Sequence, residues 1–149
     1  MKSAAQPELP QRTEADEINA WIEQAYQLHE TGVEAYGNNQ ADKAVSLFRR
    51  AIALFEQAEG SNSLNAAAVR GNLGAIYEDR CQYADAETCF ERAAAIAHEV
   101  SDESDEDLAR LQLATLYNFG RILRLQGRYA QAEPVIRRSH AFAIKRYGA

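Results

Sequence analysis

An internal repeat is the feature of this sequence that most limits the folds open to it. Residues 72–93 read NLGAIYEDRCQYADAETCFERA, and residues 118–139 read NFGRILRLQGRYAQAEPVIRRS, with identity at eight of 22 positions. A weaker copy, ETGVEAYGNNQADKAVSLFRRA, occupies residues 30–51. A chain that contains three copies of one unit is expected to stack them, because each unit buries its apolar face against its neighbour.

Each unit contains two apolar stripes with helical spacing. In the middle unit, one stripe consists of Val69, Leu73, Ile76 and Tyr77, and the other of Ala86, Phe90, Ala93 and Ala97. Residues three or four apart share one face of a helix, so the stripes predict two amphipathic helices. The turn at residues 80–82 is short enough to make these helices antiparallel. The low content of proline (three) and glycine (eight) also favours helix.

Small residues recur at fixed places in the repeat. The glycines are Gly32, Gly74 and Gly120, spaced by 42 and then 46 residues, and an alanine follows each of them twelve residues later. We expect Gly74 to face Ala86, so that the two helices approach closely at a small cost in helix propensity.

With these features the chain resembles the tetratricopeptide repeat family. Its signature of Leu-Gly-x-x-Tyr followed by Ala-x-x-x-Phe is matched by Leu73, Gly74, Tyr77, Ala86 and Phe90. The 42-residue spacing is similar to the long-helix variety found in kinesin light chains and many bacterial repeat proteins, and the resemblance covers about residues 20–147. The first and third units depart from the signature, with Ala35 and Leu123 in place of the tyrosine and Ile136 in place of the phenylalanine.

The fold expected is all-α, an α–α superhelix (solenoid) of three antiparallel helix-turn-helix units. Residues 1–12 are expected to form a disordered tail, and residues 13–149 a single domain with units at about 20–60, 62–101 and 105–147. The helices are expected at about 13–37, 41–58, 64–80, 83–100, 105–126 and 129–147.

Three local features bear on where helices begin. Thr13 with Asp16 predicts the first start, and Ser104 with Asp107 resembles a capping box for the fifth helix. Pro134 lies early in the sixth helix, so that helix either begins late or is kinked in its first turns.

Composition excludes several classes of function. The net charge of −6 divides into −13 for residues 1–107 and +7 for residues 108–149, and an acidic chain disfavours nucleic-acid binding. Neither a membrane span nor a signal peptide is recognisable, so a cytoplasmic protein with no membrane partner is expected. The acidic run 99–107 lacks the pattern of an EF-hand, and the two cysteines have no zinc-ligand spacing. We therefore expect no metal, no cofactor and, in the absence of a catalytic constellation, no enzyme.

The resemblance implies a protein-binding scaffold, with the first helix of each pair lining a concave groove. We expect an extended, acidic peptide segment of a partner to lie in that groove, because Asn can bond a peptide backbone and Arg can bind carboxylates. The residues proposed to contact it are Asn72, Asn118, Tyr117, Arg121, Arg124, Tyr36 and His29. An equally weighted alternative pairs Arg121 or Arg124 with Glu78 or Asp79 inside the protein.

Self-association is a second hypothesis, either as an end-to-end dimer or because the chain is a piece of a longer array. Repeat arrays usually end in a polar capping helix, and none follows the third pair of this sequence. We therefore expect Val135, Phe142 and Ile144 to form an exposed contact surface.

Overall fold

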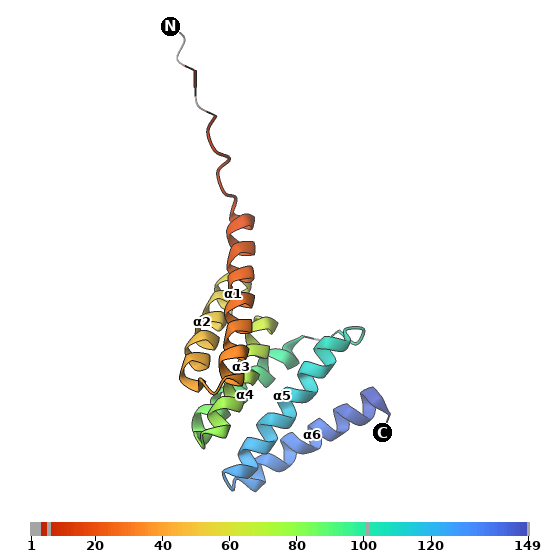
Figure 1. Ribbon diagram of the computed structural model, residues 1–149. Helices are drawn as coiled ribbons and strands as arrows, with labels where there is room; N and C mark the ends of the chain where they lie inside the picture. The colour runs from red at the N-terminus through yellow and green to blue at the C-terminus, as the bar shows by residue number, and fades with distance from the viewer. Residues whose placement is uncertain (1–3, 6, 101, 149) are drawn as a thin grey trace.

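The computed structural model describes residues 4, 5, 7–100 and 102–148, and within these residues all regular structure is α-helical. The helices are α1 (Glu14–Gly37), α2 (Ala41–Glu59), α3 (Leu64–Asp79), α4 (Tyr83–Glu99), α5 (Glu106–Leu125) and α6 (Tyr129–Tyr147). The all-α prediction is confirmed, and every helix begins and ends within one residue of the expected position. Of the expected tail, residues 1–3 and 6 lie outside the description, as do Ser101 and Ala149, while residues 7–12 are exposed and lead away from the helices (Figure 1).

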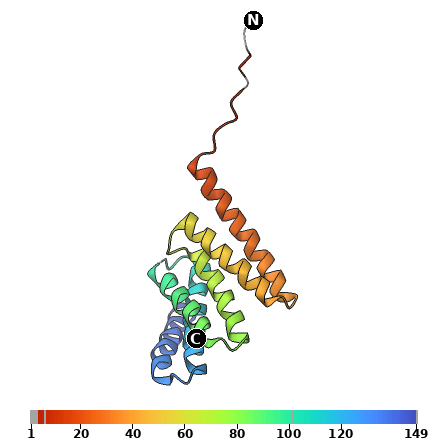
Figure 2. The same ribbon diagram turned by 90° about the vertical axis from the view of Figure 1, so that its left-hand side faces the viewer.

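The helices stack in consecutive pairs, from α1–α2 to α5–α6 (Figures 1 and 2). Each helix packs mainly against those next to it in the chain, and a smaller contact joins α3 to α5. The larger of two buried clusters extends from α1 to α5, with Phe48, Phe55, Phe90, Ile76 and Ile122 almost fully buried. The smaller cluster lies between α3, α4 and α5 and contains Ala67, Ala93 and Ile96. The observed architecture is therefore the helical solenoid expected from the repeat.

The turns inside the three pairs share one backbone geometry. Their middle residues, Asn39, Cys81 and Gly127, have φ angles of 65°, 57° and 74°. The next N–H donates to a carbonyl five residues earlier at 2.8–2.9 Å, from Gln40 to Ala35, from Gln82 to Tyr77 and from Arg128 to Leu123. The left-handed conformation is easiest for glycine, so Asn39 and Cys81 adopt it at a steric cost. The same turn gives the same antiparallel arrangement in each pair.

The signature glycines make room for a large side chain of the partner helix. A Cβ added at Gly74 would lie 2.6 Å from the Phe90 ring, and one at Gly32 would lie 2.6 Å from the ring of Phe48. The equivalent neighbour of Gly120 is Ile136, at 2.7 Å. The expectation that Gly74 faces Ala86 is therefore corrected, since the space above each glycine is filled by the residue sixteen positions later.

The helix starts confirm one prediction and correct two. Thr13 and Asp16 form a complete capping box at α1. At α5 the cap is Asp105, whose carboxylate accepts from the Leu108 N–H, while Ser104 bonds to Asp102 instead. The late start considered for α6 is also wrong, because α6 begins at Tyr129 and includes Pro134.

The connection between α4 and α5 departs most from the repeat. Helix α5 begins about one turn earlier, relative to Gly120, than α3 begins relative to Gly74. This accounts for the increase in glycine spacing from 42 to 46 residues. The extra turn and the loop before it create a partly open hollow of about 340 Å³ between the ends of α4 and α6.

Candidate functional site

The first helices of the three pairs, α1, α3 and α5, present neighbouring stripes of side chains that we call the first-helix face. On α3 the stripe is made of small and amide residues: Asn65, Ala68, Gly71, Asn72 and Ala75. Ala68 and Asn72 are exposed, and a Cβ added at Gly71 would meet nothing within 4 Å. This part of α3 is therefore covered by no other described side chain close to its backbone.

The α1 stripe is aromatic and is joined to α3 by side-chain hydrogen bonds. It consists of Tyr26, His29, Val33 and Tyr36, which share one side of the helix. Tyr26 donates to Asn65 at 2.9 Å, His29 Nε2 lies 2.8 Å from the Asn72 amide nitrogen, and the Tyr36 hydroxyl bonds to Asp79. Tyr26 and Val33 remain 46% and 50% exposed, so this stripe offers apolar surface beside the open strip of α3.

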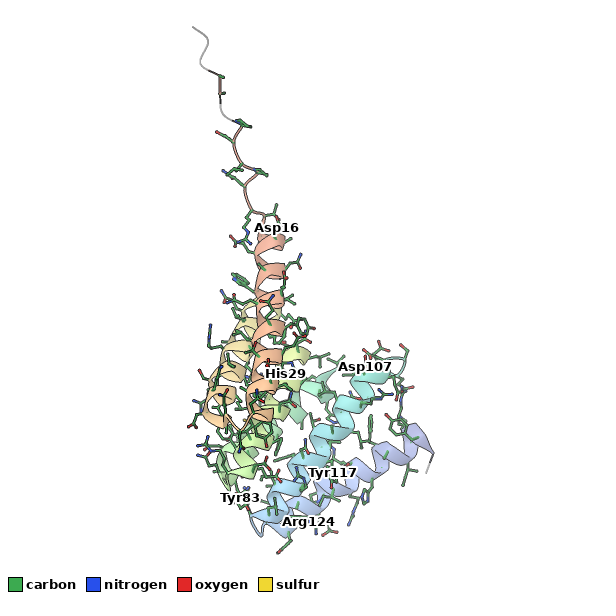
Figure 3. All side chains as sticks on the ribbon, in the orientation of Figure 1. Asp16, His29, Tyr83, Asp107, Tyr117 and Arg124 are labelled. Carbon is green, nitrogen blue, oxygen red and sulfur yellow. The ribbon has the colours of Figure 1, made fainter. Side chains whose placement is uncertain are left out.

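The α5 stripe supplies cations and one further aromatic ring. Arg121 forms an ion pair with Glu78 of α3, and its guanidinium lies 5.9 Å from the centre of the Tyr117 ring. The Asn118 side-chain oxygen is 3.4 Å from the same guanidinium, at the outer limit of a hydrogen bond. Tyr117 itself is 57% exposed. Figure 3 shows Tyr117 midway along α5 and Arg124 near the end that turns into α6.

The structure distinguishes the two roles considered for Arg121 and Arg124, which are internal pairing and ligand binding. Arg121 is paired internally with Glu78, as the second alternative expected, whereas Asp79 is bonded by Tyr36 instead of by an arginine. Within the described residues, the Arg124 guanidinium makes no hydrogen bond or ion pair, and Arg124 is exposed. Of the two proposed carboxylate-binding cations, Arg124 is thus the one with no internal partner in that part of the chain.

The Glu78–Arg121 pair is incompletely satisfied. It joins Glu78 Oε1 to Arg121 Nη1, while Glu78 Oε2 and Arg121 Nε are buried and have no hydrogen-bond partner in the described structure. Removing one of these charges would leave the other half-buried without compensation, which is more costly than removing both. A test of the face should therefore avoid changing Arg121 alone.

Burial sets the protonation of the histidine on this face. Desolvation lowers the pKa of His29, and the carboxylate of Glu30 only partly opposes that effect. His29 is therefore neutral at neutral pH, and a neutral imidazole nitrogen can accept from the Asn72 amide. Asn72 is already held in place, with its oxygen left to bind a ligand.

The structure separates the residues expected to mediate self-association. Ile144 is 59% exposed on the outer side of α6. Val135 lies against Gly120 of α5, and Phe142 packs edge-on against His98 with ring centres 6.1 Å apart. Only Ile144 of the three is on open surface.

Sequence reasoning missed Tyr26, Val33 and the small residues of α3. The signal was present, because Tyr26 and Val33 continue the stripe of His29 and Tyr36 at helical spacing. The described residues contain no group of three or more His, Cys, Asp or Glu side chains placed to hold a metal ion. In the same residues, no helix has both the length and the apolar character required to cross a bilayer.

Comparison with known proteins bears on the repeat as a whole. Two family models, both described as tetratricopeptide repeat, match residues 32–99 and 112–149, which together make up more than half of the chain. A similar solved structure is that of BtubC (BKLC) from P. vanneervenii, with a TM-score of 0.77 and 21% identity. The alignment covers 84% of this chain but only 48% of BtubC, so the likeness shows a shared fold over about half of that protein. No curated protein matches the sequence.

Proposed function

The chain belongs to the tetratricopeptide repeat family, and we propose that it binds an extended segment of a partner protein along the first-helix face. Repeats of this family mediate protein–protein interactions and form non-catalytic scaffolds. The partner segment proposed here carries at least one acidic residue. The observation that carries the proposal is the pairing of an open strip of small residues on α3 with exposed aromatic side chains on α1 and α5.

Steric access supports an extended segment on α3. A peptide backbone approaches a helix most closely where side chains are small, as at Ala68, Gly71 and Ala75. Asn72 and Asn118 then offer amide groups to the peptide main chain, which needs both a donor and an acceptor. The His29 and Arg121 contacts hold these amides in position and reduce the entropy lost on binding.

The two sides of the strip favour different ligand side chains. Tyr26, Val33 and Tyr36 present apolar surface on α1, and Tyr117 does so on α5. Carboxylates of the ligand are expected at the α5 side, where Arg124 is free of internal ion pairs among the described residues and Arg121 lies over Tyr117. If the ligand placed its carboxylates at the α1 side instead, the acidic side chains of Glu30 and Glu34 would repel them.

The test is selection from a displayed library of random peptides, followed by affinity measurement with purified variants. Asn118→Ala and Tyr117→Ala are each expected to weaken binding about tenfold, since both remove groups that α5 offers to the peptide. Tyr147→Ala is the matched control, because Tyr147 is also an exposed tyrosine but is the last residue of α6. Equal affinity of all three variants would place the binding site elsewhere on the protein.

A further inference from the structure

In the first two helix pairs, one side of the second helix packs against the first helix of the next pair. On α2 this side includes Arg49, which donates to the Tyr77 hydroxyl of α3 at 2.5 Å, and Glu56, which forms an ion pair with Arg70 of α3. On α4, Glu87 accepts from Gln126 at the end of α5 at 2.7 Å. The chain therefore contains two junctions at which a second helix packs against the next first helix, with polar contacts at different positions of the repeat.

The equivalent side of α6 is open in the structure. By repeat position, Arg49 corresponds to Arg137, and Glu56 corresponds to Ile144, and both of these α6 residues are exposed. A shallow hollow of about 440 Å³ is lined by Arg124 of α5 and by Tyr129, Glu133, Ile136, Arg137 and His140 of α6. Glu133 forms an ion pair with Arg137 within α6 and leaves Arg124 as the unpaired cation among the described residues of this hollow. We call this side of α6, together with Arg124, the stacking seat.

Arg124 belongs to a series of bridging residues. Tyr36, Glu78 and Arg124 occupy the same position in the three first helices. Tyr36 reaches forward to Asp79 of the next first helix, and Glu78 reaches forward to Arg121. Arg124 is the third member, and among the described residues no partner lies ahead of it.

Helices α1 and α6 carry opposite net charges. Helix α1 contains six carboxylates, from Glu14, Asp16, Glu17, Glu23, Glu30 and Glu34, and neither lysine nor arginine. Helix α6 contains Arg137, Arg138, Lys145 and Arg146 against the single acid Glu133. Val33 of α1 is the repeat equivalent of Arg121, the residue to which Glu78 reaches, and Glu30 and Glu34 lie on either side of it. A copy of α1 placed on the seat would bring these two carboxylates towards Arg124.

We propose that the stacking seat of one copy binds α1 of a second copy, head to tail, as α2 binds α3 and α4 binds α5. The two surfaces in contact differ, so the contact is heterologous and can repeat from copy to copy. Arg124 and Arg137 supply the positive side, and Glu30 and Glu34 the negative side. The seat shares Arg124 with the first-helix face, which the stacking would extend across neighbouring copies.

The test uses charge reversal on each surface separately. Light scattering after size exclusion, at low salt and over a concentration series, is expected to show a wild-type mass that rises above one chain and falls on raising the salt. Glu30→Lys with Glu34→Lys, and separately Arg124→Glu with Arg137→Glu, are each expected to weaken association at least about tenfold. When the two double variants are mixed, every contact between one variant and the other joins opposite charges. The mixture is therefore expected to restore the larger species.

The control variant makes the same change of charge on the same two helices, but at positions outside the seat. Arg110→Glu with Arg138→Glu alters α5 and α6 by the same charge outside the seat, and it is expected to associate nearly as well as the wild type. Circular dichroism verifies that each variant is folded. A wild type that stays monomeric at all concentrations, a Glu30/Glu34 variant that still associates, or a mixture that does not would each overturn the proposal.

Discussion

At the junction between α2 and α3, Glu56 forms an ion pair with Arg70, whereas the residue equivalent to Glu56 at the junction between α4 and α5 is His98. His98 Nε2 lies 3.1 Å from the Gln112 carbonyl oxygen, which can only accept, so this nitrogen carries a proton. Desolvation lowers the pKa of His98 and favours its neutral form. At this position of the repeat, one junction is therefore held by charges, and the other by neutral groups.

The two junctions also differ in how well they are filled. Ala66 of α3 is fully buried in the core, and its equivalent on α5 is Gln112. Gln112 donates to the Ala97 and Val100 carbonyls, both at 2.9 Å, and so satisfies the end of α4. Beside it lies the hollow of about 340 Å³, lined in part by Ala109 and Phe142. This repeat therefore tolerates a loosely filled junction when a side chain caps the exposed carbonyls.

The largest effect is expected from the same enlargement made in both junctions. Ala66→Leu adds a branched side chain where no space exists and should lower the free energy of unfolding by about 2–3 kcal/mol. Ala109→Leu extends into the hollow and should change it by less than about 0.5 kcal/mol. Urea unfolding followed by circular dichroism measures both. Equal losses in the two variants would show that the second junction is as tightly packed as the first.

Removing one charge tests the ionic junction. Arg70→Ala leaves Glu56, which is about one third exposed, without its partner and should cost about 1–2 kcal/mol. Replacing both residues with leucine should recover most of that loss, because no lone charge remains. Arg80→Ala is the control, since its partner Asp42 is 91% exposed and the pair should contribute below about 0.5 kcal/mol. Equal effects of Arg70→Ala and Arg80→Ala in urea unfolding would contradict the assignment.

Gln112→Ala tests the neutral junction. It removes two hydrogen bonds to carbonyls at the end of α4 and should cost about 1 kcal/mol, because water entering the hollow can replace part of them. Gln27→Ala, at an exposed position of α1, should be nearly neutral. Hydrogen exchange should also speed up in the last turn of α4 of the Gln112 variant. If both the stability and the exchange rate were unchanged, the Gln112 side chain would not act as a cap for α4.

The smallest effect is a pH dependence specific to the second junction. The folded protein holds His98 with a pKa below its ordinary value of 6.5, so the unfolded chain binds more protons around and below that pH. The contribution is fully present well above pH 6.5 and is lost as the pH falls from there through the lowered pKa of His98 in the folded protein. Thermal unfolding of His98→Gln should show a shallower decline over this window. His29 acts in the same direction, so some decline should remain in this variant.

The fold could be read from the sequence because it depends on local patterns. Apolar periodicity, short turns and the Thr13 cap placed the helices, and the glycine spacing revealed the three units. The partner of Gly74 was misjudged because the signature gives the residues of the pair but not the depth to which the Phe90 ring enters. The capping residue of α5 was misjudged because Ser104, Asp105 and Asp107 are all competent to cap, and only the path of the loop selects Asp105.

The site was less accessible to sequence reasoning, because it depends on how far each pair is rotated relative to the next. The forward bonds of Tyr36 and Glu78 connect residues 43 positions apart and follow from that rotation. The sequence therefore allowed Arg121 and Arg124 the same two roles, and the structure distinguishes them. The hollow beside His98 was likewise invisible, since it arises from one additional helical turn without any motif of its own.

The restriction of packing to successive helices also has a consequence for how the protein reaches its native state. Contacts of this kind have short sequence separations, so chain segments need to close only small loops before they gain stabilising interactions. Rapid folding from any of the three pairs is expected, followed by growth to its neighbours. Unfolding should begin at the terminal helices, each of which packs on one side only, and α3 and α4 should open last.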